Sequence, residues 1–137
     1  YGPWGRPDMA LFIFTKAILE GKPIEVYNHG NMQRDFTYIE NVVQANLLAL
    51  DATGASGETF NIACGESVTL KAVLECLAEF SNQVVMPEYQ APRAGDIKHS
   101  LADISKAQRL LGYRPVIPFR EGLKRTLEFF RQRRASR

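Results

Sequence analysis

The feature that most constrains the fold is an alternation of short strand-like runs with amphipathic helical patterns. The most regular helical pattern covers residues 70–80, where apolar side chains recur with the i, i+3, i+4, i+7 spacing of one buried helix face. These apolar residues are Leu70, Val73, Leu74, Leu77 and Phe80. Thr69 is placed to cap the start of this helix, and Asn82 to end it. Helices that alternate with strands predict an α/β fold, here with more helix than strand.

The other elements follow from the same periodicities. An apolar run after Pro7 predicts a largely buried first helix that Gly21 ends. A second helix is expected to be buried along the side that carries Val43, Leu47 and Leu50. The segment 88–96 contains Pro and Gly and is expected at the surface. The predicted helices cover 9–20, 42–50, 70–81, 103–111 and 119–134, and the predicted strands cover 24–27, 36–39, 58–63 and 84–86.

Composition narrows the class of protein. A chain of 137 residues with 45% hydrophobic and 23% charged residues suits one globular domain. The net charge of +2 is too small to indicate a nucleic-acid partner by itself. Cys64 and Cys76 form neither a disulfide framework nor a metal motif, so we expect reduced thiols and a cytoplasmic location. We find no signal peptide and no apolar run near the roughly 18 residues of a membrane helix, so no membrane partner is expected.

Two arginines are the main candidates for chemistry. Arg34 lies in a polar turn just before an aromatic run, and Arg93 lies far downstream between Pro92 and Gly95. A guanidinium group suits a diphosphate because its planar fork donates several hydrogen bonds and keeps its charge. The alternatives are a local Arg34–Asp35 ion pair that closes a turn and a solvated Arg93 in a loop. We expect the two arginines to meet at one anion site.

Further candidates surround these arginines. Asp96 could accept hydrogen bonds from ribose hydroxyls, and Arg6 could meet an acidic sugar group or lie free at the surface. Tyr27 could stack on a base, although an aromatic at a strand end is more often part of the core. His29 and His99 are expected at the surface, and their spacing to acids and thiols indicates no metal site.

Several catalytic signatures do not occur in the sequence. It contains no Gly-rich dinucleotide fingerprint, no P-loop and no G-x-S-x-G elbow. None of the five tyrosines is followed by a lysine four places on. These residues therefore offer no general base and no cofactor loop, and no catalytic residue is predicted within them.

Five short motifs carry a resemblance to a known family. They are Tyr1-Gly2-Pro3, Gly30-x-x-x-Arg34-Asp35-Phe36-x-Tyr38-Ile39, Phe60-Asn61-Ile62-Ala63, Pro92-Arg93-x-Gly95-Asp96 and Asp103-x-Ser105-Lys106-Ala107. In this order they resemble the C-terminal part of extended short-chain dehydrogenase/reductases, the NAD-dependent nucleotide-sugar epimerase/dehydratase family. Residues 1–10 are similar to UDP-glucuronate 4-epimerases, including bacterial capsule-type enzymes of polysaccharide biosynthesis. Glu40 stands where relatives commonly carry Asp.

The resemblance implies a division of labour. In the family, an N-terminal Rossmann domain binds NAD and supplies a Tyr/Lys catalytic pair, and the C-terminal part binds the UDP-sugar. Residues 1–137 would form that UDP-sugar-binding domain, with NAD bound mainly by a half that is absent. Since the chain opens on Tyr1 within a loop-like run, we expect it to be a piece of a longer protein. Alone it should be inactive, and its apolar first helix would expose a sticky face.

The resemblance also implies roles for individual residues. Arg34 and Arg93 would contact the diphosphate, and Asp96 the uridine ribose. Val26 and Tyr27 would flank the uracil, and Arg6 would lie near the uronate carboxylate. Tyr1, Gly2 and Pro3 would border the nicotinamide end of the cofactor.

The function implied for the full-length protein is interconversion of UDP-glucuronate and UDP-galacturonate by NAD-dependent oxidation and reduction at C4, by a homodimer. One alternative is an NAD-dependent dehydratase or decarboxylase of a similar UDP-sugar. Another is a non-catalytic nucleotide-sugar-binding module. A weak nucleic-acid binder that uses the arginines of residues 131–137 is a further alternative, but this tail lacks interleaved aromatic residues.

Overall fold

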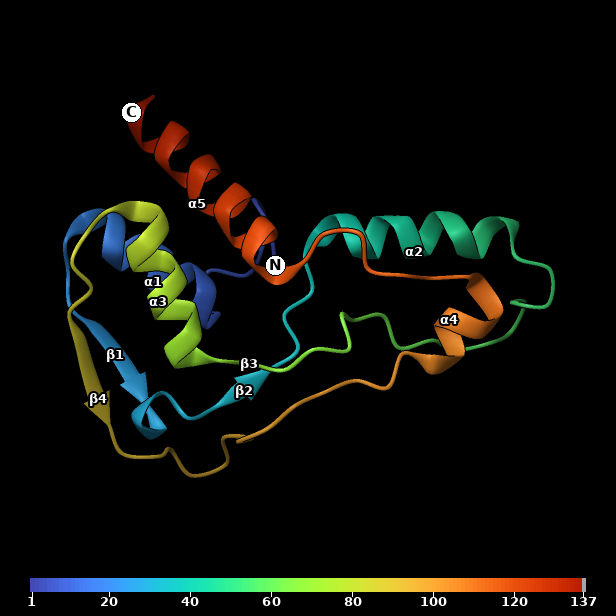
Figure 1. The fold of residues 1–137 in the computed structure, drawn as a ribbon, viewed down its shortest axis with the longest axis horizontal. Helices are drawn as coiled ribbons and strands as arrows, with labels where there is room; N and C mark the ends of the chain where they lie inside the picture. The colour runs from blue at the N-terminus through green and yellow to red at the C-terminus, as the bar shows by residue number, and fades with distance from the viewer. Residues whose placement is uncertain (137) are drawn as a thin grey trace.

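The computed structural model describes residues 1–136 and confirms an α/β chain in which helices outweigh strands (Figure 1). The helices are α1 (Ala10–Glu20), α2 (Ile39–Asp51), α3 (Leu70–Ser81), α4 (Ser105–Leu111) and α5 (Phe119–Ala135), with a 3-10 turn η1 (Asn28–Gly30). The strands are β1 (Ile24–Tyr27), β2 (Gln33–Arg34), β3 (Val68–Thr69) and β4 (Pro87–Gln90).

The first of two cores lies between α1, α3, α5 and the strand pair β1–β4. These strands run parallel in the register Ile24↔Pro87 to Tyr27↔Gln90. Ile24 and Val26 face the core because alternate side chains of a strand point to opposite sides. Helix α1 buries most of its apolar face here, so the expectation that it exposes a sticky surface was wrong.

The second core lies at the other end of the molecule, between α2, α4 and residues 60–63 (Figure 1). Its centre is Tyr113, which has no exposed surface and whose hydroxyl donates to the Ala63 carbonyl at 2.9 Å. Burial raises the pKa of Tyr113 to about 12, so the hydroxyl stays a hydrogen-bond donor.

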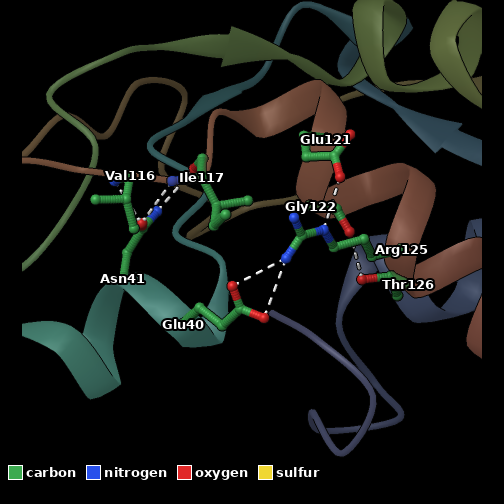
Figure 2. Close-up of polar contacts among 8 residues, drawn as sticks. All are labelled: Glu40, Asn41, Val116, Ile117, Glu121, Gly122, Arg125 and Thr126. Carbon is green, nitrogen blue, oxygen red and sulfur yellow. Dashed lines mark hydrogen bonds and ion pairs between the residues drawn. The ribbon is translucent and has the colours of Figure 1, made fainter.

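The two cores are joined where α2 begins, beside the start of α5 (Figure 2). The buried Asn41 amide donates to the Ile117 carbonyl at 2.8 Å and accepts from the Val116 and Ile117 N–H groups, each at 2.9 Å. Next to it, Arg125 of α5 forms ion pairs with Glu40 at 2.9 Å and Glu121 at 2.7 Å. Glu40 stands where relatives commonly carry Asp, and its carboxylate links α2 to α5 through Arg125.

The predicted helices are all present, and their ends lie within three residues of the predicted ones. Thr69 caps α3 by accepting from the Ala72 N–H at 3.0 Å, and Asn82 ends this helix with a left-handed φ of 52°. Asp103 accepts from the Ser105 N–H at the start of α4, and Gly112 ends α4 with a φ of 65°. Local residues therefore determine where α3 and α4 begin and end: side-chain acceptors mark the starts, and left-handed backbone marks the ends.

The strand predictions succeeded only for 24–27. Residues 36–38 form no strand, although the Thr37 carbonyl accepts from the terminal ammonium group of Tyr1 at 2.6 Å, and Ile39 already belongs to α2. Residues 84–86 precede the strand rather than form it, because β4 pairs with β1 from Pro87 onward. Residues 58–63 form no strand within the described residues, since no neighbouring strand pairs with them.

The prediction for the apolar side of α2 was also wrong. Val43, Leu47 and Leu50 are 48%, 59% and 81% exposed. The helix instead buries Asn41 and Ala45 on its opposite side. Periodicity located an apolar stripe, but it could not tell which of two apolar sides the chain covers.

Candidate functional site

The arginine-bearing turn 30–34 is held between two distant parts of the chain. Gln33 and Arg34 pair antiparallel with Thr69 and Val68 of β3. On the other side, the Gln33 N–H donates to the Lys98 carbonyl at 2.8 Å, and the Ser100 N–H donates to the Gln33 carbonyl at 3.1 Å. The turn is therefore anchored along both edges of β2.

The half-buried Arg34 side chain is fixed by backbone carbonyls. Its Nη1 atom donates to the Gln33 carbonyl at 2.7 Å and to the Lys98 carbonyl at 3.4 Å. Within residues 1–136 Arg34 has no carboxylate partner. Its positive charge therefore remains available to an anion.

The alternative of a local Arg34–Asp35 ion pair is wrong. The Asp35 carboxylate instead accepts from the backbone N–H groups of Cys64 and Gly65, each at 2.9 Å. Burial, and then the nearby Asp35 carboxylate, raises the pKa of the Cys64 thiol. Asp35 thus anchors the chain after residues 58–63, and Cys64 stays a neutral thiol.

Arg93 lies in the exposed segment 91–100, which follows β4. Its guanidinium carbon is 3.6 Å from the centre of the Tyr27 ring, in a cation–π contact. Tyr27 is the last residue of β1, and its partner in the parallel register is Gln90 of β4. The pairing of β1 with β4 therefore places Arg93, which follows β4, next to Tyr27 at the end of β1.

The segment 91–100 brings the two arginines to the same stretch of backbone. Arg93 belongs to this segment, and Arg34 donates to the Lys98 carbonyl within it. Arg93, like Arg34, has no carboxylate partner in the described part of the chain. Asp96 is exposed in the same segment, where its N–H donates to the Arg93 carbonyl at 3.3 Å. Shared contact with one diphosphate stays a prediction.

The remaining predicted substrate residues differ in exposure. Val26 has no exposed surface, so its side chain belongs to the core and only its backbone could flank a base. Arg6 lies at the surface, where it pairs with Asp8 through two 3.0 Å hydrogen bonds. Hydrogen bonding from Arg6 lowers the pKa of Asp8. An ion pair this exposed is weak, so Arg6 can exchange partners easily.

Tyr1 is half-buried and Gly2 is buried, and both pack against neighbouring elements. The Tyr1 hydroxyl donates to the Phe119 carbonyl at 2.8 Å, and burial raises the pKa of this hydroxyl. Its ring packs edge-on against Phe36 and Tyr38. Gly2 is buried with φ 154°, and a side chain there would meet Ile39 at 2.7 Å. The third predicted cofactor neighbour, Pro3, contributes to the lining of a groove between the opening loop, α1 and α5.

Sequence reasoning missed the contribution of Lys98 and His99. His99 pairs with Gln33 in an isolated parallel bridge, and the Lys98 carbonyl accepts from both Gln33 and Arg34. The contacts of Gln33 and Arg34 with Lys98 and His99 join residues more than 60 positions apart. Each of them uses a backbone atom of Lys98 or His99. No local sequence signal could have revealed them.

A groove of about 440 Å³ lies elsewhere, between the opening loop, α1 and α5. Trp4, Phe12, Phe130 and Arg133 contribute to its lining, whereas neither Arg34 nor Arg93 does. The two arginines therefore lie outside this groove. None of the described helices is long and apolar enough to cross a membrane.

Comparison with known proteins gives consistent matches over nearly the whole chain. The profile of the NAD-dependent epimerase/dehydratase family matches residues 1–63. UDP-glucuronate 4-epimerase from Thermodesulfobacterium geofontis is 38% identical over 133 residues, which are 96% of this chain and 41% of that protein.

Two solved structures show the same fold. UDP-glucose 4-epimerase from Thermotoga maritima, solved with UDP-glucose, matches 97% of this chain and 43% of its own, with TM-score 0.89 and 36% identity. UDP-glucuronic acid 4-epimerase from Bacillus cereus, solved with UDP-glucuronic acid and NAD, matches 96% of this chain and 42% of its own, with TM-score 0.90 and 33% identity.

The chain spans only 33% to 44% of the length of the curated relatives that it matches. Within that span the agreement covers both ends of the molecule and both of its cores. The sequence and structural matches together place the chain in the NAD-dependent epimerase/dehydratase family.

Proposed function

We propose that residues 1–137 form the UDP-sugar-binding part of an NAD-dependent UDP-glucuronate 4-epimerase. The intact enzyme would interconvert UDP-glucuronate and UDP-galacturonate by oxidation and reduction at C4. The observation that carries this proposal is the pair Arg34 and Arg93. The Arg34 guanidinium donates to the exposed segment 91–100, Arg93 belongs to that segment, and neither arginine has a carboxylate partner among residues 1–136. Similarity to the Bacillus cereus enzyme, solved with UDP-glucuronic acid and NAD, supports the substrate class.

Within this proposal the chain binds and orients the nucleotide. Arg34 and Arg93 neutralise the diphosphate, while Asp96 accepts from the ribose hydroxyls. Arg6 leaves the exposed Asp8 carboxylate for the uronate carboxylate, which offers the same planar, bidentate geometry. These contacts would hold the sugar in fixed orientation without taking part in bond making.

The residues of this chain do not themselves form a dinucleotide site, because they contain no Gly-rich fingerprint and no Tyr-x-x-x-Lys pair. NAD, which supplies reversible hydride transfer, would be held mainly by residues beyond this chain. Pro3 and the backbone around it would border the nicotinamide. We therefore expect no turnover from the 137 residues alone and NAD-dependent turnover once a dinucleotide-binding part is joined to them. Cytoplasmic location, dimerisation and a role in polysaccharide biosynthesis stay predictions.

Calorimetry with UDP-glucuronate, UDP and UMP tests the binding role. Arg34→Gln and Arg93→Gln should each weaken UDP binding roughly 10- to 100-fold, because a hydrogen bond to a charged group contributes about 1.5–3 kcal/mol. UMP, which lacks the second phosphate, should be affected less. The matched control is Arg109→Gln, which removes an exposed arginine of α4.

The two substitutions should also be strongly non-additive if both guanidinium groups hold one diphosphate. Arg6→Gln should reduce the preference for UDP-glucuronate over UDP-glucose without changing the affinity for UDP. Wild-type affinity for UDP in both Arg34→Gln and Arg93→Gln would refute the proposal.

A further inference from the structure

The groove between the opening loop, α1 and α5 has the size of a small-molecule site. Its volume of about 440 Å³ falls within the roughly 300–1,000 Å³ that ligand pockets in proteins occupy. The two arginines proposed to hold the diphosphate do not line it, so a ligand of this groove would be a second one. The side chains of the groove indicate which chemistry that ligand should have.

Aromatic side chains provide the apolar part of the groove. Phe12 of α1 and Phe130 of α5 pack edge to face, with ring centres 5.8 Å apart. Trp4 of the opening loop packs edge-on against Phe129, with ring centres 5.6 Å apart, yet Trp4 is 80% exposed. A large indole ring that lies open beside packed phenyl rings offers a flat apolar surface to a planar ligand.

Three cationic side chains line the same groove. Lys16 comes from α1, and Arg133 and Arg134 come from the end of α5. All three are exposed, and none of them forms an ion pair within residues 1–136. The guanidinium carbon of Arg133 lies 5.0 Å from the centre of the Trp4 ring, so a charged donor group adjoins the exposed aromatic surface.

The single carboxylate among the described groove residues leaves this positive charge uncompensated. Glu20 already pairs with Lys22 at 2.8 Å, and the hydrogen bond from Lys22 holds the pKa of the Glu20 carboxyl below its usual range. Lys22 itself does not line the groove. An apolar floor beside unpaired cations is complementary to an amphipathic anion and repels a cation.

We propose that this groove is a binding site for a small planar aromatic anion, such as an aryl carboxylate. The aromatic part of the ligand stacks on Trp4 and contacts the phenyl rings of α1 and α5. Its acidic group accepts hydrogen bonds from Arg133 and Arg134. The inference goes beyond the proposed function, because the groove shares no residue with the proposed diphosphate site.

Trp4 gives this groove a reporter of its own, because it is the only tryptophan in the sequence. Its indole N–H signal in NMR spectra of the 137-residue chain should shift saturably on titration with naphthoate, with a dissociation constant on the order of 0.1 mM. Naphthamide has the same rings without the charge and should bind roughly 10-fold more weakly, because the charge-assisted hydrogen bonds are lost. Naphthylmethylammonium, which carries the opposite charge, should not bind measurably.

Substitutions separate the charged part of the site from the aromatic part. Arg133→Gln combined with Arg134→Gln should weaken naphthoate binding roughly 10-fold and abolish the preference over naphthamide. Trp4→Ala, measured by calorimetry, should weaken the binding of both ligands roughly 3- to 10-fold. The matched control is Lys124→Gln, which removes an exposed cation of α5 outside the groove and should leave both affinities unchanged.

Three results would overturn the inference. One is a Trp4 signal that naphthoate does not shift. Another is equal affinity for naphthoate and naphthamide, since the cations would then play no part. The third is a loss of binding in Lys124→Gln as large as in the doubly substituted protein, since the attraction would then come from the overall charge of α5. Because no nucleotide is used, none of these results bears on the proposed function.

Discussion

The guanidinium carbon of Arg93 lies 3.6 Å from the centre of the Tyr27 ring. Arg93 belongs to an exposed segment, where a long side chain would otherwise sample many rotamers. The contact with the aromatic face limits this freedom. We therefore propose that Tyr27 is a platform that holds the Arg93 guanidinium group in position for an anion.

If Tyr27 is such a platform, removing its ring should weaken UDP binding. Tyr27→Ala should raise the dissociation constant roughly two- to fivefold, since an exposed cation–π contact contributes about 0.5–1 kcal/mol. Tyr27→Phe keeps the ring face and should bind like the wild type. Calorimetry with UDP measures both variants. Tighter binding by Tyr27→Ala would mean that the ring masks Arg93 rather than presents it.

Asp35 should contribute mainly to stability. Its carboxylate accepts from the N–H groups of Cys64 and Gly65, and Asp35→Ala leaves both without this partner. We expect a loss of about 2–3 kcal/mol in the free energy of unfolding, measured by urea denaturation. Asp35→Asn retains one acceptor oxygen and should lose less. An Asp35→Ala protein as stable as the wild type would contradict the assigned role.

Arg34 and Asp35 illustrate how far sequence reasoning reached. Adjacent opposite charges suggested a local ion pair, yet each side chain bonds to backbone atoms 29 to 64 positions away. The family motif over residues 30–39 predicted that this segment is part of the binding site, because motif order is a property of the sequence. It could not predict the partners, because long-range backbone contacts depend on how the strands come together.

Neighbouring residues of α2 should differ sharply in their effect on stability. Asn41 is fully buried with three hydrogen bonds to residues 116 and 117, whereas Glu40 forms a surface ion pair with Arg125 (Figure 2). Asn41→Ala should lower the free energy of unfolding by about 2–4 kcal/mol, because it leaves three backbone groups without their hydrogen-bond partner. Glu40→Gln should cost less than about 1 kcal/mol. Urea denaturation of both variants provides the comparison, and equal losses would contradict it.

Alkaline pH should destabilise the second core through Tyr113. Its pKa is raised to about 12 in the folded chain, from about 10 when unfolded. Above pH 10 the unfolded state releases this proton first, so stability is full below pH 10 and falls as the pH approaches 12. The loss should be roughly 2–3 kcal/mol. Tyr113→Phe should reduce this slope in unfolding experiments between pH 9 and 12, and an unchanged slope would contradict the assignment.

The helices were predictable and three of the four strands were not, for a physical reason. A helix satisfies its own backbone, and caps such as Thr69 and Gly112 are visible locally. A strand exists only with a partner. Residues 58–63 have the alternation of a strand but find no partner within the described chain, and Val84 and Val85 have strand propensity but lie just before the residues that pair.

The close approach of α5 to Tyr38 leads to opposite expectations for the effect of Gly122→Ala on stability. Gly122 lies inside α5, where helix propensity alone favours alanine by about 1 kcal/mol. In the structure, a Cβ atom at position 122 would lie 2.8 Å from Cγ and 2.9 Å from Cβ of Tyr38, and would also collide with the Tyr1 hydroxyl. Tyr38 is only 5% exposed and packs edge-on against Tyr1, so neither ring can move away without disturbing the other.

Gly122→Ala should therefore lower the free energy of unfolding by about 1–3 kcal/mol, as overpacking does in other cores. Lys124→Ala, an exposed position on the same helix, is the matched control and should change stability by less than about 0.5 kcal/mol. Urea denaturation followed by far-UV circular dichroism measures both variants. A Gly122→Ala protein more stable than the wild type would show that helix propensity outweighs the contact, and that α5 is not held against Tyr1 and Tyr38 as described.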